Sequence, residues 1–117
     1  MPVEKPASKP ATFVGSSLDD LRDFPRSARR ATGFQLDKVQ NGEDADDWKP
    51  MPAVGSGVHE IRVRDESGAF RLMYVAKFTE AVYVLHAFQK KTQKTPRGDL
   101  VLAKDRYQEV LMRRKSL

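Results

Sequence analysis

Three strand-like runs in the second half of the sequence constrain the fold more than any other feature. They cover residues 58–64, 69–78 and 81–88. In the first run, Ile61 and Val63 alternate with charged side chains, the two-residue period of a strand with one buried and one solvated face. The turn before the second run contains Gly68, which can adopt a positive φ, so we expect a hairpin there. Because the later runs are apolar on both faces, the pattern predicts an antiparallel sheet.

A single arginine interrupts the apolar centre of the second run. A partly desolvated guanidinium is costly unless an anion pairs with it, so Arg71 requires a negative partner. That partner can be structural, with Glu60 across the hairpin as the candidate, or it can be an anionic ligand. The spacing leaves both possibilities open, and the two can hold together.

Composition excludes several kinds of site. The chain has 117 residues, enough for one domain with a modest core. It has no cysteine, and its two histidines lack neighbouring ligand residues, so we expect neither a disulfide framework nor a bound metal. No apolar run is long enough to cross a membrane, and prolines stand where a signal peptide needs an apolar centre, so we expect a cytoplasmic protein.

Two helices are predicted before the sheet. Residues 1–10, with their spaced prolines, are predicted to be a flexible tail, and residues 11–117 a single domain that opens with a short strand. The first helix begins after Ser16 and Ser17, at capping-box spacing from the acids that follow. The second starts at Pro25 or Arg26 and stops at the Asn-Gly pair after Gln40. Its buried face is predicted to carry Ala28, Thr32, Leu36 and Val39.

The rest of the chain completes the predicted fold. Residues 43–57 form a long polar loop, from which Trp48 and Met51 are expected to pack on the core. Asp99 is predicted to be the N-cap of a C-terminal amphipathic helix. The fold class is therefore α+β: two N-terminal helices, an antiparallel sheet of three to four strands and a C-terminal helix.

Charge is unevenly distributed along the chain. The formal net charge is +5, with basic residues concentrated between residues 86 and 117 and four acids within residues 43–47. A basic patch opposite an acidic one suits a polyanionic partner held in one orientation. A solvated surface gives the same pattern, so charge alone does not decide between them.

Five segments resemble, in order, the sequence pattern of a known toxin family. They are FVGSSLDDLRDFP (13–25), GFQLDKVQNGEDADDWKPM (33–51), GVHEIRVR (57–64), FRLMYV (70–75) and VLHAFQKKTQKTP (84–96). On these segments the chain is similar to RelE superfamily toxins, specifically the HigB-like, phage-related branch of type II toxin-antitoxin systems. The resemblance implies an RNase-like fold and a cytoplasmic, metal-independent and cofactor-free endoribonuclease that cuts mRNA at the ribosome. It also implies a helix-turn-helix antitoxin as partner.

The resemblance also assigns roles to individual residues. Arg71 matches the phosphate-stabilising arginine of the family, Lys90 and Lys91 match a basic pair after the last strand, and Arg62 matches a lysine of some members. Some members have a lysine where this chain has Glu60, which cannot stabilise negative charge and could instead orient Arg62. The residues expected to contact RNA or the ribosome are Lys94, Arg97 and Arg106.

The proton acceptor of such a reaction is left open by the sequence. Lys91, deprotonated through crowding with Lys90 and Arg71, is one candidate, and His86 and His59 are others. His86 is expected to share a strand face with Val84 and Phe88 as a hydrogen-bonded core residue.

Two other functions are compatible with the sequence. The same fold occurs in ParE-like toxins, which inhibit DNA gyrase without cutting RNA. The chain can also be an inactive prophage remnant that only binds an antitoxin.

Overall fold

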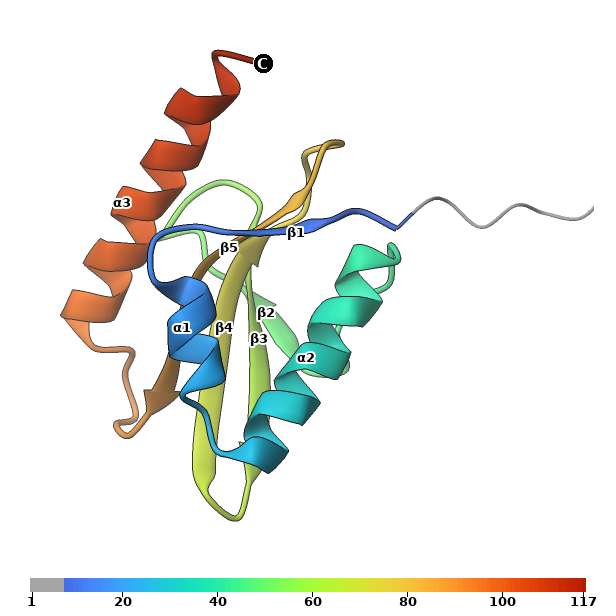
Figure 1. The fold of residues 1–117 in the computed structure, drawn as a ribbon. Helices are drawn as coiled ribbons and strands as arrows, with labels where there is room; N and C mark the ends of the chain where they lie inside the picture. The colour runs from blue at the N-terminus through green and yellow to red at the C-terminus, as the bar shows by residue number, and fades with distance from the viewer. Residues whose placement is uncertain (1–7) are drawn as a thin grey trace, which may run out of the picture.

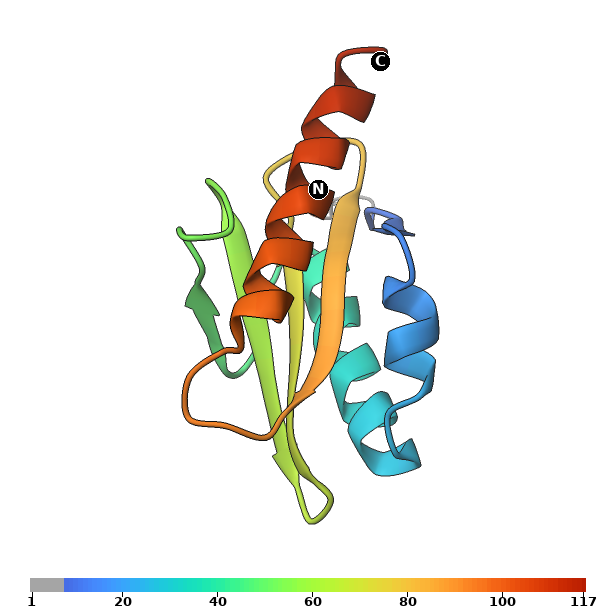
Figure 2. The ribbon, with the colours of Figure 1, turned by 90° about the vertical axis from the view of Figure 1, so that its left-hand side faces the viewer.

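A five-stranded sheet separates two layers of helices in the computed structural model, which describes residues 8–117 (Figure 1). The strands are β1 (Ala11–Phe13), β2 (Trp48–Pro50), β3 (Val58–Asp65), β4 (Gly68–Val75) and β5 (Val82–Lys90). The helices are α1 (Ser17–Arg22), α2 (Arg26–Gln40) and α3 (Arg97–Arg114). The spatial order of the strands is β1-β5-β4-β3-β2, and all neighbours are antiparallel except β1 and β5. The second view shows α3 on one face of the sheet and α1 and α2 on the other (Figure 2).

The α+β prediction is confirmed, with a larger sheet than expected. The additional strand is β2, which lies within the predicted loop and pairs with β3. All three of its side chains are exposed, so it has no apolar alternation by which it could be recognised in the sequence. Met51 is buried as predicted, but the prediction for Trp48 is wrong, because its side chain is 36% exposed and stacks on His59.

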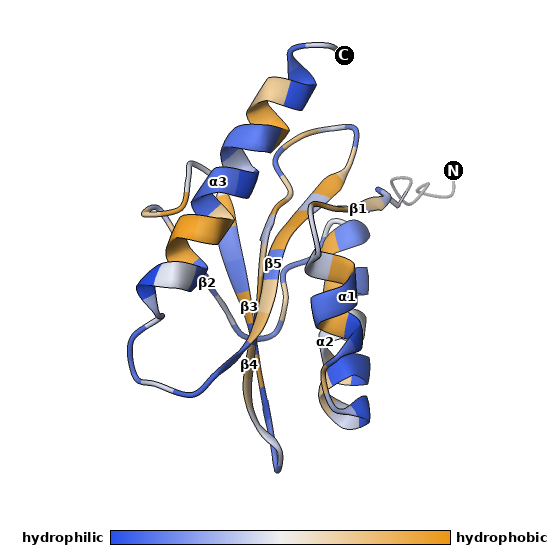
Figure 3. Cartoon of the chain, turned by 60° about the vertical axis from the view of Figure 1, so that its left-hand side comes forward, coloured by the Kyte–Doolittle hydropathy of each residue, from blue (hydrophilic) through white to orange (hydrophobic). Residues whose placement is uncertain are grey.

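Two apolar clusters lie between the sheet and its helices. Figure 3 shows the hydrophobic residues on the strands and helices that contribute to them. One lies under α1 and α2 and includes the predicted apolar residues of α2, together with Ile61, Phe70, Leu72 and Val84. The other lies under α3 and includes Val58, Met73, Leu85, Tyr107 and Val110. Alternate residues of each strand therefore point into different clusters, as strand geometry requires.

A β-bulge in β5 breaks this alternation. Met73 pairs with His86, whereas the next residue, Tyr74, pairs with Val84, so Leu85 is an extra residue in β5. Leu85 packs in the cluster under α3, and His86 forms a polar contact with Asp99 of the same helix. The expectation that His86 and Val84 share a face is therefore wrong.

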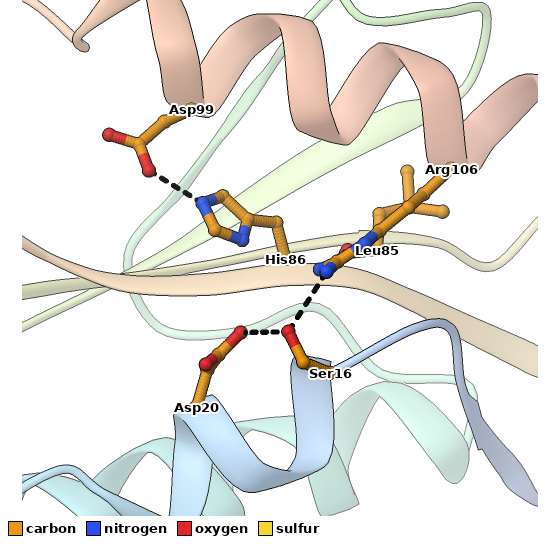
Figure 4. Close-up of polar contacts among 6 residues, drawn as sticks. All are labelled: Ser16, Asp20, Leu85, His86, Asp99 and Arg106. Carbon is orange, nitrogen blue, oxygen red and sulfur yellow. Dashed lines mark hydrogen bonds and ion pairs between the residues drawn. The ribbon is translucent and has the colours of Figure 1, made fainter.

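Polar contacts hold α3 at three points along its length, and Figure 4 shows those of Asp99 and Arg106. Near its start, Nε2 of His86 lies 2.6 Å from Oδ1 of Asp99. Asp99 was predicted as the N-cap, but the helix begins at Arg97, and the carboxylate contacts the sheet instead of capping the backbone. Near its end, Nε of Arg114 donates to Oε2 of Glu80 over 2.6 Å.

Arg106 forms the central attachment. Its Nη1 donates to the carbonyl of Leu85 over 2.9 Å, and its Nη2 donates to Oγ of Ser16 over 2.9 Å. Ser16 precedes α1, but its hydroxyl makes no capping bond and donates to Asp20 instead. The guanidinium thus joins α3, the bulge in β5 and the start of α1.

The described chain is already bonded to the domain before β1. The backbone N–H of Lys9 donates to the carbonyl of Gln40, and the carbonyl of Pro10 accepts from Val82. These two residues belong to the predicted tail, whose residues 1–7 lie outside the described part. Within residues 8–117, no helix has the length and apolarity to cross a membrane.

We predict that Arg106→Met destabilises the protein by about 1–3 kcal/mol, because it leaves the buried carbonyl of Leu85 without its donor. Urea denaturation of the variant and the wild type measures the difference. Lys104→Met is the matched control, since Lys104 is exposed on the same helix. Equal losses for both variants would contradict this assignment.

We also predict an acid-sensitive contribution from Glu80. Its contact with Arg114 lowers the pKa of Glu80 from its ordinary value of 4.5 to about 2. A lowered pKa in the folded state adds stability above the unfolded pKa, and this stability is lost as the pH falls toward the folded pKa. The stability gap between wild type and Glu80→Gln should therefore shrink between about pH 5 and pH 2. A gap that is constant over this range would refute the prediction.

Candidate functional site

The face of the sheet beyond the start of α3 carries a concentration of cations. Residues that pair across β3, β4 and β5 form rows on this face of the sheet. Two adjacent rows are Arg62–Arg71–Phe88 and Arg64–Ala69–Lys90. The preceding row contains His86, which contacts the first turn of α3. The helix therefore begins over that row, and the next two rows lie beyond its N-terminal end.

A pocket of about 390 Å³ lies over these two rows. It is lined by Arg62, Arg64, Ala69, Arg71, Lys90, Lys91, Thr92 and Gln93. The structure therefore brings together the four residues that the sequence analysis proposed as catalytic: Arg62, Arg71, Lys90 and Lys91. They come from β3, β4, β5 and the loop that follows β5.

Arg71 is the least exposed of these cations. Its exposed fraction is 5%, yet it lines the pocket, so it contributes to the pocket floor. Its Nη1 donates to the carbonyl of Phe70 over 3.1 Å, and its Nε lies 3.4 Å from Oε1 of Glu60. The ion pair with Glu60, which the sequence left as one of two possibilities, is present in the structure. It is diagonal in the sheet, because the residue directly opposite Glu60 is Met73.

Burial determines the protonation properties around the floor. It lowers the pKa of Arg71 and raises that of Glu60, and in each case the charge of the partner opposes the shift. Burial also lowers the pKa of Lys90, and the positive charge of Arg71 adds to the effect. A cluster of like charges in a partly desolvated site favours an anionic ligand, which offsets their repulsion.

Four lining residues were not predicted, namely Arg64, Ala69, Thr92 and Gln93. Arg64 follows Arg62 by two residues on β3, so the strand period alone places it on the same face, and this signal was available in the sequence. Thr92 and Gln93 line the pocket because the loop after β5 turns back over the sheet. No sequence pattern indicates such a turn.

The three predicted RNA contacts lie outside the pocket lining. Lys94 is exposed on the loop after β5, directly after the lining residue Gln93, and Arg97 is exposed in the first turn of α3. Arg106 is buried, and its guanidinium bonds to Leu85 and Ser16, so its geometry favours a structural role over contact with RNA.

Neither histidine lines the pocket. His86 is buried beneath α3, where its ring stacks on that of Phe88 with 5.0 Å between the ring centroids. His59 stacks on Trp48 and meets the edge of Tyr74. Of the candidate proton acceptors named from the sequence, only Lys91 reaches the pocket. Among residues 8–117 no group of three histidine or carboxylate side chains is arranged to hold a metal ion.

Comparison with known proteins agrees with this architecture. Residues 19–108 match the family described as "Phage derived protein Gp49-like (DUF891)". The fold is similar to that of an Escherichia coli RelE toxin in the free state, in a mutant with two arginines changed to alanine. The TM-score is 0.62 at 13% sequence identity, over 89% of this chain and 99% of that chain. No curated protein matches the sequence. Since the family match spans most of the chain, the protein belongs to the phage-derived Gp49-like family, a family of RelE/HigB-type toxins.

Proposed function

We propose that this toxin is a metal-independent endoribonuclease of a type II toxin-antitoxin system that cuts mRNA at the ribosome. The observation that carries the proposal is the convergence of Arg62, Arg71, Lys90 and Lys91 on one pocket. Cations at the floor and rim of a concave site can surround a phosphate from several directions. Single-stranded RNA offers such a phosphate at every nucleotide.

The proposed reaction uses the RNA itself as nucleophile. The 2′-hydroxyl oxygen forms a bond to the adjacent phosphorus, and the bond from phosphorus to the 5′-oxygen of the next nucleotide breaks. The products are a 2′,3′-cyclic phosphate and a 5′-hydroxyl. Negative charge builds on the non-bridging oxygens in the transition state, where preorganised donors such as Arg71 and Arg62 stabilise it.

Two proton transfers accompany these bond changes. The attacking hydroxyl gives up a proton, and the leaving 5′-oxygen takes one. Lys90 is the better-supported acceptor, because its lowered pKa increases the share of neutral amine. Lys91, which is exposed at the same pocket, is the candidate donor to the leaving oxygen.

A toxin of this kind requires an antitoxin that neutralises it. We propose a helix-turn-helix protein as this partner, as the resemblance to HigB-like toxins implies. Action on translated mRNA would place both proteins in the cytoplasm.

Arg71→Ala should lower kcat/KM for RNA cleavage by about 100-fold or more, the usual loss when one transition-state donor is removed. The assay follows a purified ribosome-bound mRNA and identifies the 2′,3′-cyclic phosphate ends. Arg71→Lys keeps the charge without the planar donor fork, and it should lose most of the activity while remaining folded. Arg30→Ala, at an exposed position of α2, is the matched control.

Two results would contradict the proposal. One is full cleavage activity in both the Arg71→Lys variant and the Arg71→Ala variant. The other is growth arrest with intact transcripts, which would favour inhibition of DNA gyrase. A chain that causes no growth arrest at all would point to an inactive remnant.

RNA binding should depend on salt through the cations of the pocket. Each phosphate contact contributes about −0.7 to the slope of log K against log salt for single strands, so Lys91→Gln should reduce the slope by about that amount. Fluorescence anisotropy with a short RNA in which the 2′-hydroxyls are replaced by hydrogen measures binding without cleavage. Lys104→Gln, exposed on α3, should leave the slope unchanged. The same slope for wild type and Lys91→Gln would contradict a contact between Lys91 and an RNA phosphate.

A further inference from the structure

A buried carboxylate lies beside the floor of the cationic pocket. Glu60 is 1% exposed, although carboxylates are rarely buried without full pairing. Its Oε1 lies 3.4 Å from Nε of Arg71, and its Oε2 has no hydrogen-bond partner among the described residues. Such a group costs stability, so its presence beside several cations calls for a role that offsets the cost.

The position of Glu60 argues against proton transfer with a substrate. A general base must come within about 2.6–3.2 Å of the proton-bearing atom, directly or through one water. Glu60 is buried and does not line the pocket, whereas Arg71 does. The carboxylate can therefore act on a bound phosphate only through a neighbouring side chain.

Arg71 is the side chain through which it can act. A guanidinium has five N–H donors, one on Nε and two on each terminal nitrogen. Nη1 of Arg71 donates to the carbonyl of Phe70. Nε lies 3.4 Å from Oε1 of Glu60 as an ion pair and makes no hydrogen bond to the described residues. Nη2 makes no hydrogen bond to any of the described residues, so its donors remain for a ligand in the pocket.

Charge explains why a carboxylate is needed at this place. Arg71 lines the same pocket as Arg62, Arg64, Lys90 and Lys91, and their repulsion acts on its guanidinium. A flexible arginine would relieve this repulsion by turning toward solvent. We infer that Glu60 is a positioning residue that holds the guanidinium of Arg71 at the pocket floor with its free donors available to the scissile phosphate. This role rests on the proposed ribonuclease function.

Glu60→Gln tests the inference, because it keeps the size and shape of the side chain and removes only its charge. We expect kcat for RNA cleavage to fall by about 100-fold, as expected when a reacting geometry shifts by about 1 Å. KM should stay the same or decrease, because the pocket becomes more positive. Glu66→Gln is the matched control, since Glu66 is exposed in the turn between β3 and β4 and should leave both constants unchanged.

A double-mutant cycle separates positioning from other roles. Arg71→Lys already loses the guanidinium that Glu60 holds, so adding Glu60→Gln should cause little further loss in kcat. If the losses in kcat of the two single variants multiply in the double variant, the inference is overturned. Unchanged kcat in Glu60→Gln would also overturn it. Loss of the rising limb of the pH–rate profile in Glu60→Gln would overturn it in favour of a proton acceptor.

A spectroscopic measurement tests positioning independently of cleavage. In the wild type, the NMR signal of the Arg71 Nε–H group, assigned with Arg71→Lys, should exchange slowly with solvent at neutral pH. In Glu60→Gln it should exchange rapidly, while the amide spectrum shows an intact fold. If Glu60→Gln does not fold, fast exchange of this group in the wild type still overturns the inference. A wild type that cuts no RNA but keeps the slow exchange would overturn the proposed function and leave the positioning intact.

Discussion

The docking of α3 on β5 determines how much of the sheet is covered by protein and how much can receive a ligand. Both faces of β4 and β5 are apolar over most of their length, so a helix must cover the face opposite α1 and α2. Asp99 contacts His86 in the first turn of the helix, and this contact marks where the cover ends. The rows beyond it carry Arg62, Arg71 and Lys90 in place of apolar residues, so the sheet continues as a cationic floor.

This arrangement concentrates positive charge where burial makes it most effective. Water screens a charge at an exposed rim, but it screens a partly buried guanidinium much less. The free protein therefore contains repulsion that a bound polyanion relieves. Binding of RNA would then stabilise the folded state, as any ligand specific for the native state does. The buried carboxylate of Glu60, in the row beside the cluster, reduces this repulsion without occupying the pocket.

Family membership and site chemistry support different parts of the functional conclusion. The match over residues 19–108 identifies a toxin family, and the similarity to RelE identifies the fold. A fold of this kind can hold different activities, so the activity has to be argued from the site. Cations from four segments surround one pocket, and Lys90, whose pKa is lowered by partial burial and by Arg71, is among them.

Periodicity in the sequence determined the elements, and long-range contacts decided the site. The two-residue period of residues 58–64, the two apolar runs that follow and the helical face of α2 were sufficient to predict β3, β4, β5 and α2, because burial leaves a local pattern of apolar side chains. The anomaly of Arg71 and the basic pair Lys90–Lys91 at the end of β5 also indicated the site. The bulge at Leu85, the contact of Asp99 with His86 and the burial of Arg106 left no local pattern. Each depends on partners far away in the chain, so only the tertiary structure could decide which cations face a ligand and which hold the fold together.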